Sequence, residues 1–238
     1  MQKRRNKILL YFALVFLVAL LSFVFFIETQ FNKVEQKPFT QASSKNWAHR
    51  GYASTEKEEN TLAAVALAFQ KEYKGVEIDL WFKDGQFYIS HEESYVDSLP
   101  KLAEVFEKFP DDYFWLDLKN LSYSNYERIS NQLDQLKKSK KSYLIESKKG
   151  LPLGLLHKKG FKTSYWMTNG NFIRQFIQKC WIIYFKYNGI SMPVKEYLEK
   201  DIRKKYKHLN IHLWDKHPNP KVYQWDEVKI VLDDYEIK

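Results

Sequence analysis

The chain has 238 residues, a formal net charge of +9 and a single cysteine. One cysteine excludes a disulfide within the chain. No nucleic-acid recognition motif accompanies the excess of basic residues, so we expect no nucleic-acid partner.

A long apolar segment lies near the N-terminus. Residues 8–27, ILLYFALVFLVALLSFVFFI, contain no charged side chain. As a helix rising about 1.5 Å per residue they would span about 30 Å, the thickness of a bilayer core. A cleaved signal peptide is the alternative, but its apolar run is typically shorter and is followed by an Ala-x-Ala-like site. We therefore predict an uncleaved, single-pass transmembrane anchor.

The charges that flank this segment predict its orientation. Residues 1–7 are rich in lysine and arginine, whereas Glu28 follows the apolar run. By the positive-inside rule residues 1–7 lie in the cytoplasm, which places the rest of the chain on the extracytoplasmic side. Residues 28–45 are polar and predict a short tether. Residues 46–238 then form one folded domain.

The domain begins with strand- and helix-forming segments in close succession. Residues 47–49 are short and apolar, as in a strand. Asn60-Thr61 offers an N-cap to a helix whose apolar side chains recur at helical spacing as far as Phe69. Gly75 is expected to end that helix. Residues 76–80 then alternate as a strand does.

This strand carries two acidic side chains on one face. Glu77 and Asp79 are two residues apart, so both point to the same side of the sheet. Two neighbouring carboxylates repel each other unless a cation lies between them. Asp84-Gly85 predicts a tight turn into an accessory strand over residues 86–90, which is followed by His91.

Beyond His91 strand-like and helical segments alternate, as in βα units. With 47–49 and 76–80 they give eight strands, apart from the accessory one. We predict strands at 113–119, 142–146, 162–167, 181–186, 209–214 and 227–232, and helices at 99–109, 123–136, 151–159, 170–179 and 193–207.

Five short motifs occur in order along residues 47–92. They are His49-Arg50-Gly51, Glu59-Asn60-Thr61, Glu77-Ile78-Asp79, Lys83-Asp84-Gly85 and His91-Glu92. Each is weak by itself, but the ordered series resembles the glycerophosphodiester phosphodiesterase family. The resemblance is dense to about residue 120 and loose from there to the C-terminus, where residues 228–235 are similar to the family's last strand. It implies an α/β fold, a compact TIM (β/α)8 barrel, with active residues at the C-terminal ends of the strands.

The resemblance also implies a metal site. Glu77 and Asp79 match two of the family's metal ligands, and Asp117 stands where the family usually has the longer Glu. Carboxylate oxygens favour a hard divalent cation, so we expect Ca²⁺ or Mg²⁺.

Four further residues match the family's phosphate-binding and acid-base positions. Arg50 and Lys119 correspond to the phosphate-binding cations. His49 and His91 correspond to the acid-base pair, in which one imidazole takes a proton while the other gives one up.

Two more residues are candidates for supporting roles. Glu59 either orients a residue of the site or caps the helix that follows it. Trp214 lies where the family often places an aromatic side chain against the substrate, and core packing is an equal alternative.

The implied activity is metal-dependent hydrolysis of glycerophosphodiesters to glycerol 3-phosphate and an alcohol. A variant is phospholipase D-like action on intact lipids, with a lysophospholipid-type substrate. The alternative of another class is an inactive barrel that serves as a binding module, for which Asp117 and Glu92, both departures from the family pattern, would be signs of drift.

Lysines and arginines of the domain occur in clusters, which are either solvated helix ends or contacts with anionic lipid head groups beside the anchor. The clusters are at 137–141, 148–149, 158–159 and 203–205.

Overall fold

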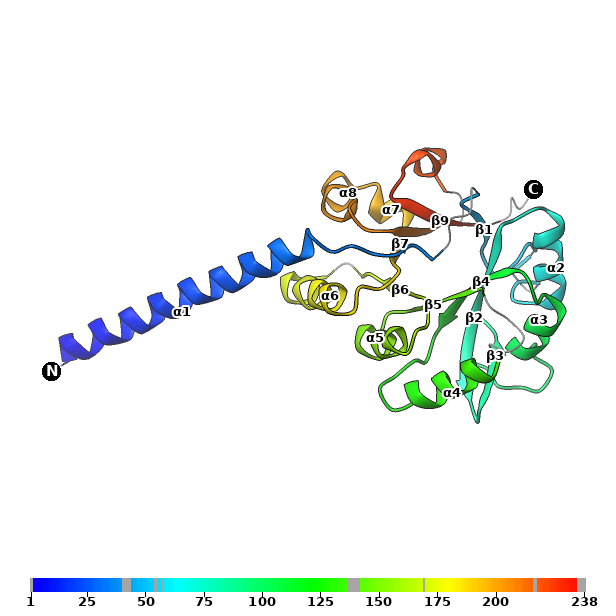
Figure 1. Ribbon diagram of the computed structural model, residues 1–238, viewed down its shortest axis with the longest axis horizontal. Helices are drawn as coiled ribbons and strands as arrows, with labels where there is room; N and C mark the ends of the chain where they lie inside the picture. Colours follow the sequence, from blue (N-terminus) through cyan, green and yellow to red (C-terminus); the bar gives the residue numbers. More distant parts are fainter. Residues whose placement is uncertain are drawn as a thin grey trace.

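The computed structural model describes residues 2–39, 44–53, 55–56, 58–136, 142–168, 170–215 and 218–234. A long helix projects from one side of a barrel in which helices surround a ring of strands (Figure 1). The lysine-rich cluster at 137–141 lies outside the described residues.

The projecting helix is α1 (Gln2–Phe31). Arg4–Phe31 has a mean hydropathy of 2.9 over its most apolar window, and none of that window is buried against the barrel. The helix is therefore long and apolar enough to cross a membrane, a test that a signal sequence near the N-terminus also passes.

The segment that follows the apolar run contacts the barrel. The helix continues beyond the predicted end at residue 27 to Phe31, whose side chain is buried, as is that of Val34. The side chain of Asn188 donates to the carbonyl oxygen of Lys37 (2.8 Å), and the backbone N–H of Asn210 donates to Gln36 Oε1 (2.8 Å). Residues 31–37 thus lie across the end of the barrel where these strands begin, so this part of the predicted tether is docked.

Eight parallel strands form a closed barrel, as predicted, because β1 pairs with both β9 and β2. The ninth strand, β3 (Gln86–Ile89), pairs antiparallel with β2 outside the ring. The barrel strands are β1 (Asn46–Ala48), β2 (Gly75–Lys83), β4 (Tyr113–Leu118), β5 (Tyr143–Ser147), β6 (Thr163–Trp166), β7 (Gly189–Pro193), β8 (Ile211–Asp215) and β9 (Val228–Asp233).

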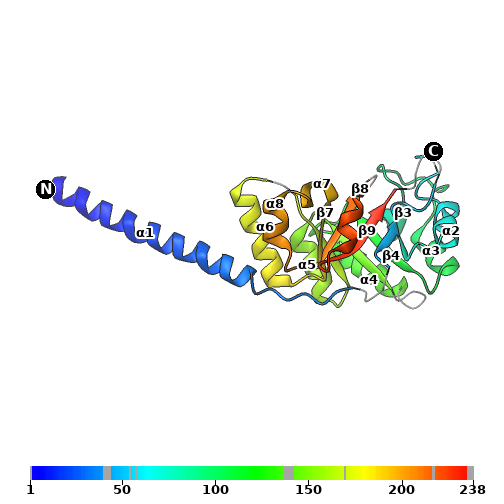
Figure 2. The ribbon, with the colours of Figure 1, turned by 90° about the horizontal axis from the view of Figure 1, so that it is seen from above.

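Helices surround the barrel and cover the outward-facing apolar residues of the strands (Figures 1 and 2). A separate buried cluster that includes Trp47, Trp115 and Leu144 fills the interior. The helices are α2 (Leu62–Gln70), α3 (Leu102–Lys108), α4 (Tyr126–Leu136), α5 (Gly150–Lys158), α6 (Phe172–Phe185), α7 (Val194–Tyr197), α8 (Lys200–Tyr206) and the 3₁₀ helix η1 (Pro220–Gln224).

The prediction that Gly75 ends the first barrel helix is wrong. The helix α2 ends at Gln70, and Gly75 is the first residue of β2. A Cβ at this position would lie 2.6 Å from the ring of Trp47. The glycine therefore lets the indole of Trp47 pack against the backbone of β2.

The strand predicted at 181–186 is wrong. Those residues are the last turns of α6, which is capped by Asn171 and ends where Lys186 adopts a left-handed conformation (φ 53°). A short apolar run fits a buried helix and a buried strand equally well. The strand is instead β7 (Gly189–Pro193), which contains glycine and proline and so lacks the usual strand signal.

The helix predicted at 193–207 is two short helices, α7 and α8. The break falls at Leu198 and Glu199, where Glu199 has an extended backbone.

Candidate active site

Strand register brings the acidic residues together at the C-terminal end of the barrel. Asp79 on β2 is level with Asp117 on β4, which in turn is level with Glu146 on β5. Glu77 is two residues before Asp79 and shares its face. All four carboxyl groups are buried. The fold thus concentrates negative charge in a place with little water to solvate it.

Three of these carboxylates form a group that suits one metal ion. Glu77, Asp79 and Asp117 each offer an oxygen within 4.8 Å of the others. Oxygens that share one Ca²⁺ or Mg²⁺ ion bind it at about 2.0–2.6 Å and so lie no more than about 5 Å apart. The three predicted ligands therefore fit such an ion in spacing and in donor type.

The charges in this group are not balanced by the protein alone. Arg50 Nε lies 3.0 Å from Asp79 Oδ2, and Lys119 Nζ lies 2.5 Å from both Asp79 Oδ1 and Asp117 Oδ2. Three carboxylates thus share two cations. Burial and the neighbouring Asp79 carboxylate raise the pKa of Glu77 well above its ordinary value. A divalent ion would supply the missing positive charge.

The carboxylate of Asp79 contacts three side chains, those of Lys119, Arg50 and Asn60. Although burial opposes its ionisation, Lys119 and Arg50 lower its pKa below the ordinary value. The side-chain amide of Asn60 donates to Asp79 Oδ2 (2.9 Å), while the Asp79 N–H donates to Asn60 Oδ1 (3.0 Å). Asn60 was not predicted as a site residue, although it belongs to the Glu59-Asn60-Thr61 motif.

Arg50 is fixed by its backbone and by Glu59. It adopts a left-handed conformation (φ 55°), and its N–H donates to Glu77 Oε2 (3.0 Å). Its guanidinium Nη1 donates to Glu59 Oε2 (3.0 Å). The helix α2 is capped by Thr61, whose Oγ1 accepts from the Ala64 N–H (3.1 Å). Of the two roles considered for Glu59, orientation of a site residue therefore has a structural basis.

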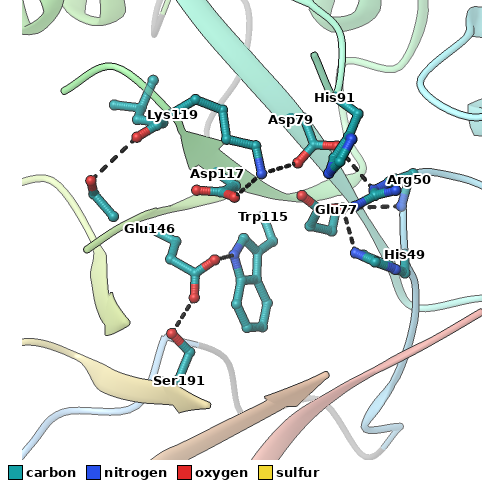
Figure 3. A network of polar contacts seen from close by, with 12 residues as sticks. His49, Arg50, Glu77, Asp79, His91, Trp115, Asp117, Lys119, Glu146 and Ser191 are labelled. Atoms are coloured by element: carbon teal, nitrogen blue, oxygen red, sulfur yellow. Dashed lines mark hydrogen bonds and ion pairs between the residues drawn. The ribbon is translucent and has the colours of Figure 1, made fainter. Parts of the chain in front are cut away.

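The two predicted histidines lie at the same cavity. His49 Nε2 is 3.8 Å from Glu77 Oε2, and its Nδ1 contacts the carboxylate of Asp234. His91 is half exposed, and its Nδ1 lies 2.9 Å from the carboxylate of Glu92. Figure 3 shows His49, Arg50 and His91 together beside Glu77 and Asp79. Each imidazole thus has one nitrogen near a carboxylate.

The cavity has a volume of about 240 Å³. Trp214 and Trp166 form part of its wall, with ring centroids 5.3 Å apart in an edge-to-face arrangement. Of the nine predicted site residues only Glu59 does not line it, and Glu59 reaches it through Arg50. The eight lining residues are His49, Arg50, Glu77, Asp79, His91, Asp117, Lys119 and Trp214.

Sequence reasoning missed two acidic residues of the site. Glu146 lines the cavity, accepts from Trp115 Nε1 (3.0 Å) and contacts the Ser191 hydroxyl. Burial and the nearby Asp117 raise its pKa to about 8. Asp234, the partner of His49, belongs to the C-terminal segment that is similar to the family's last strand, which was the available signal. Glu146 belongs to none of the motifs.

Comparisons with known proteins show the fold. No family model and no curated protein matches the sequence. Solved structures do match: a glycerophosphodiester phosphodiesterase from Thermotoga maritima is 22% identical with a TM-score of 0.62, covering 82% of this chain and 96% of that one. One from Agrobacterium tumefaciens is 17% identical, with a TM-score of 0.59 and coverage of 82% and 97%.

A third similar structure contains a reaction product. It is a phosphodiesterase from Oleispira antarctica in complex with sn-glycerol-3-phosphate, 19% identical, with a TM-score of 0.58 and coverage of 81% of this chain and 93% of that one. These likenesses extend over almost the whole of each solved chain. The chain therefore has the barrel fold of solved glycerophosphodiester phosphodiesterases.

Proposed function

We propose that this protein is a metal-dependent phosphodiesterase of the glycerophosphodiester phosphodiesterase family, which hydrolyses glycerophosphodiesters to glycerol 3-phosphate and an alcohol. One observation carries the proposal: two histidines, two cations and three clustered carboxylates line one cavity at the C-terminal end of the barrel. The similar structures from Thermotoga maritima and Agrobacterium tumefaciens are named glycerophosphodiester phosphodiesterases, and the phosphodiesterase from Oleispira antarctica holds sn-glycerol-3-phosphate, which supports the assignment.

The cations of the site suit a phosphodiester. Arg50 presents a guanidinium that can bind two phosphoryl oxygens, while Lys119 supplies a compact positive charge. Both are held at the cavity by Asp79. A divalent ion bound by Glu77, Asp79 and Asp117 would add positive charge that offsets the negative charge of the phosphoryl oxygens. We assign Ca²⁺ or Mg²⁺ because the donors are all carboxylate oxygens.

Two proton transfers are required, and two histidines are available. Hydrolysis adds the elements of water: the attacking oxygen loses a proton, and the departing alkoxide oxygen gains one. We assign one transfer to His49 and one to His91, since both line the cavity. Asp234 contacts His49 Nδ1, which leaves Nε2 facing Glu77 and the cavity.

We further propose that α1 anchors the barrel in a membrane, with residues 1–7 in the cytoplasm and the active site on the opposite side. The support is the length and hydropathy of α1 together with the basic residues that precede it.

The test is glycerol 3-phosphate release by the purified full-length chain in detergent micelles. Glycerophosphocholine and glycerophosphoethanolamine are supplied with Ca²⁺, with Mg²⁺ or with a chelator. We expect release that depends on one of the two ions. A chain that binds neither ion and releases no product from either substrate would be an inactive barrel, and the proposal would be wrong. A lysophospholipid tests the phospholipase D-like variant, with lysophosphatidic acid and the head-group alcohol as the measured products, because that reaction releases no glycerol 3-phosphate.

A further inference from the structure

The helix α6 has an apolar surface that the barrel does not cover. Phe172 and Ile173 are each 66% exposed, and Ile177 is 46% exposed. These residues lie in the N-terminal half of a helix whose opposite side packs on the barrel through Ile182 and Phe185. Apolar side chains grouped in this way on a surface helix indicate a binding face. We call these three residues the apolar face of α6.

The apolar face lies beside the apolar helix α1. The rings of Phe23 and Phe176 have centroids 5.9 Å apart, and one turn away Phe172 stacks on Phe176 (6.3 Å). Further along both helices, Lys179 contacts the carboxylate of Glu28. Figures 1 and 2 both show α6 as the barrel helix next to the C-terminal end of α1.

These contacts fix the depth of α6 if α1 crosses a bilayer. Phe23 lies within the predicted span 8–27, about 6 Å from its end at 1.5 Å per residue. Phe176 touches it, so the N-terminal half of α6 must lie at the level where head groups meet acyl chains. Interfacial helices bury their apolar side chains about 5–10 Å into that region. The apolar face is thus placed where such burial is possible.

Basic side chains adjoin the apolar face. Lys148, Lys149 and Arg174 line a surface cavity of about 540 Å³ whose walls include Ile173 and Ile177, and no acidic residue is among its described lining residues. Cations beside apolar side chains match an anionic membrane surface, which attracts Lys and Arg side chains close to it. Lys148 also lies over the ring of Trp166 (3.7 Å), which lines the catalytic cavity. The basic cavity therefore neighbours the active site.

We propose that the apolar face of α6 and the basic cavity formed by Lys148, Lys149 and Arg174 dock on the surface of an anionic bilayer. The apolar side chains enter the interface, and the cations contact lipid phosphates. The proposal rests on the proposed membrane anchoring by α1 but not on the proposed activity. It holds the barrel against the bilayer, with the mouth of the active site beside the head groups.

The test uses the full-length chain in nanodiscs that hold one copy each. Cys180, the only cysteine, is replaced by serine, and an environment-sensitive fluorophore is attached to Ile177→Cys. The matched control is Glu107→Cys, an exposed position on α3, on the side of the barrel away from α1 (Figure 2). In discs of phosphatidylcholine with phosphatidylglycerol, lipids carrying a quencher near the head group should quench the probe at 177 and leave the probe at 107 unquenched.

Charge reversal tests the basic cavity in the same discs. Lys149→Glu with Arg174→Glu should abolish quenching at 177, whereas Lys71→Glu with Lys108→Glu, exposed lysines on the far side, should not. Equal exposure of the two probes to quencher would overturn the proposal. So would protection of the 177 probe only in discs that hold two copies, because a second copy would then be the occupant. Since the readout is fluorescence, failure here leaves the phosphodiesterase assay as an independent result.

Discussion

The ammonium of Lys119, which directly follows β4, lies 2.5 Å from the carboxylate of Asp79 on the neighbouring strand β2. The same ammonium lies 2.5 Å from Asp117. One side chain thus separates two buried carboxylates that would otherwise repel each other directly. A lysine assigned to phosphate binding is therefore also a structural counter-ion, and its replacement should affect stability as well as activity.

We predict that Lys119→Met destabilises the barrel by about 3 kcal/mol near neutral pH, the typical cost when one partner of a buried ion pair is lost. Because Lys119 lowers the pKa of Asp79, the stabilising effect of the pair is present above the ordinary pKa of Asp, about 3.9, and is lost as pH falls through the folded-state value. The difference between variant and wild type should therefore vanish in acid. Urea unfolding followed by tryptophan fluorescence from pH 2 to 8 measures it.

Lys195→Met is the matched control for that experiment, since Lys195 follows β7 at the same end of the barrel but is exposed. Its free energy of unfolding should stay within about 0.5 kcal/mol of the wild-type value. A Lys119→Met variant as stable as this control would mean that the buried carboxylates do not need their counter-ion.

The carboxylates themselves are predicted to bind the metal. Glu77→Gln and Asp79→Asn keep the shape of the side chain but remove its charge. Each should lower turnover at least about 100-fold, equivalent to about 2.7 kcal/mol, with a parallel loss of bound ion measured by elemental analysis. Glu104→Gln, an exposed position on α3, should change neither quantity. Full ion content with normal turnover in both site variants would rule out this metal site.

The histidine assignment predicts a particular kinetic pattern. His49→Ala and His91→Ala should each lower kcat and kcat/KM together, because a proton-transfer residue acts in the transition state. The wild-type pH–rate profile should be bell-shaped, and each variant should lose one limb. If one histidine only positions the phosphate, its variant will instead raise KM and keep both limbs.

Asp234 gives an independent check on His49. Its carboxylate contacts His49 Nδ1, so Asp234→Asn should lower kcat by positioning the imidazole less firmly, with little change in KM. Glu92→Gln tests the corresponding contact at His91. The Glu92 side chain is 87% exposed, so its replacement should have a much smaller effect. Equal effects of the two variants would argue against a special role for the partly buried contact between His49 and Asp234.

Much of the site could be predicted because its residues lie in short, continuous motifs. Alternation along one strand was enough to place Glu77 and Asp79 on one face, and the ordered series of motifs identified His49, Arg50 and His91. The alternating segments predicted the strands, apart from β7, and the resemblance to the family implied that they close into a barrel. That strand contains Gly189 and Pro193, so its packing against neighbouring strands, rather than any local propensity, determines its structure.

The residues that were missed depend on the closure of the barrel. Asp234 comes within reach of His49 only because β9 pairs with β1, 185 residues apart in sequence. Glu146 becomes part of the site because β5 is in register with β4. Neither pairing is visible in a window of sequence. The docking of Phe31 and Val34 on the barrel was missed for the same reason, since composition alone indicated a polar tether.

Glu146 should make the stability of the metal-free protein depend on pH. Its folded-state pKa of about 8 lies above the ordinary 4.5, so the folded state binds the proton more tightly than the unfolded state does. The stability due to this group is therefore fully present below pH 4.5 and is lost as pH rises towards 8. In a chelator, Glu146→Gln should remove that loss, and the variant should gain on the wild type by a few kcal/mol between those limits.

Glutamine is a suitable replacement because its amide can still accept from Trp115 Nε1 and can donate to the Ser191 hydroxyl. Urea unfolding at a series of pH values checks the prediction, with Glu104→Gln, whose side chain is exposed, as the control. A difference between Glu146→Gln and the wild type that is constant from pH 4.5 to 8 would show that Glu146 keeps an ordinary pKa.

The orientation of α1 can be tested in living cells. Basic residues precede the apolar run of α1, and Glu28 follows it, so residues 1–7 should stay in the cytoplasm and the barrel should be exported. Alkaline phosphatase fused after residue 238 should then be active, because it matures only outside the cytoplasm, while a cytoplasmic reporter at the same position should be inactive. Replacing Lys3, Arg4, Arg5 and Lys7 by glutamine should weaken this bias, whereas replacing the lysines at 204, 205 and 207, which are far from the span in the sequence, should not. Because a cleaved signal sequence would export the barrel too, the size of the fusion on a denaturing gel must also be measured. The full-length mass in the membrane fraction is expected, and a shorter, released product would show that α1 is a signal sequence rather than an anchor.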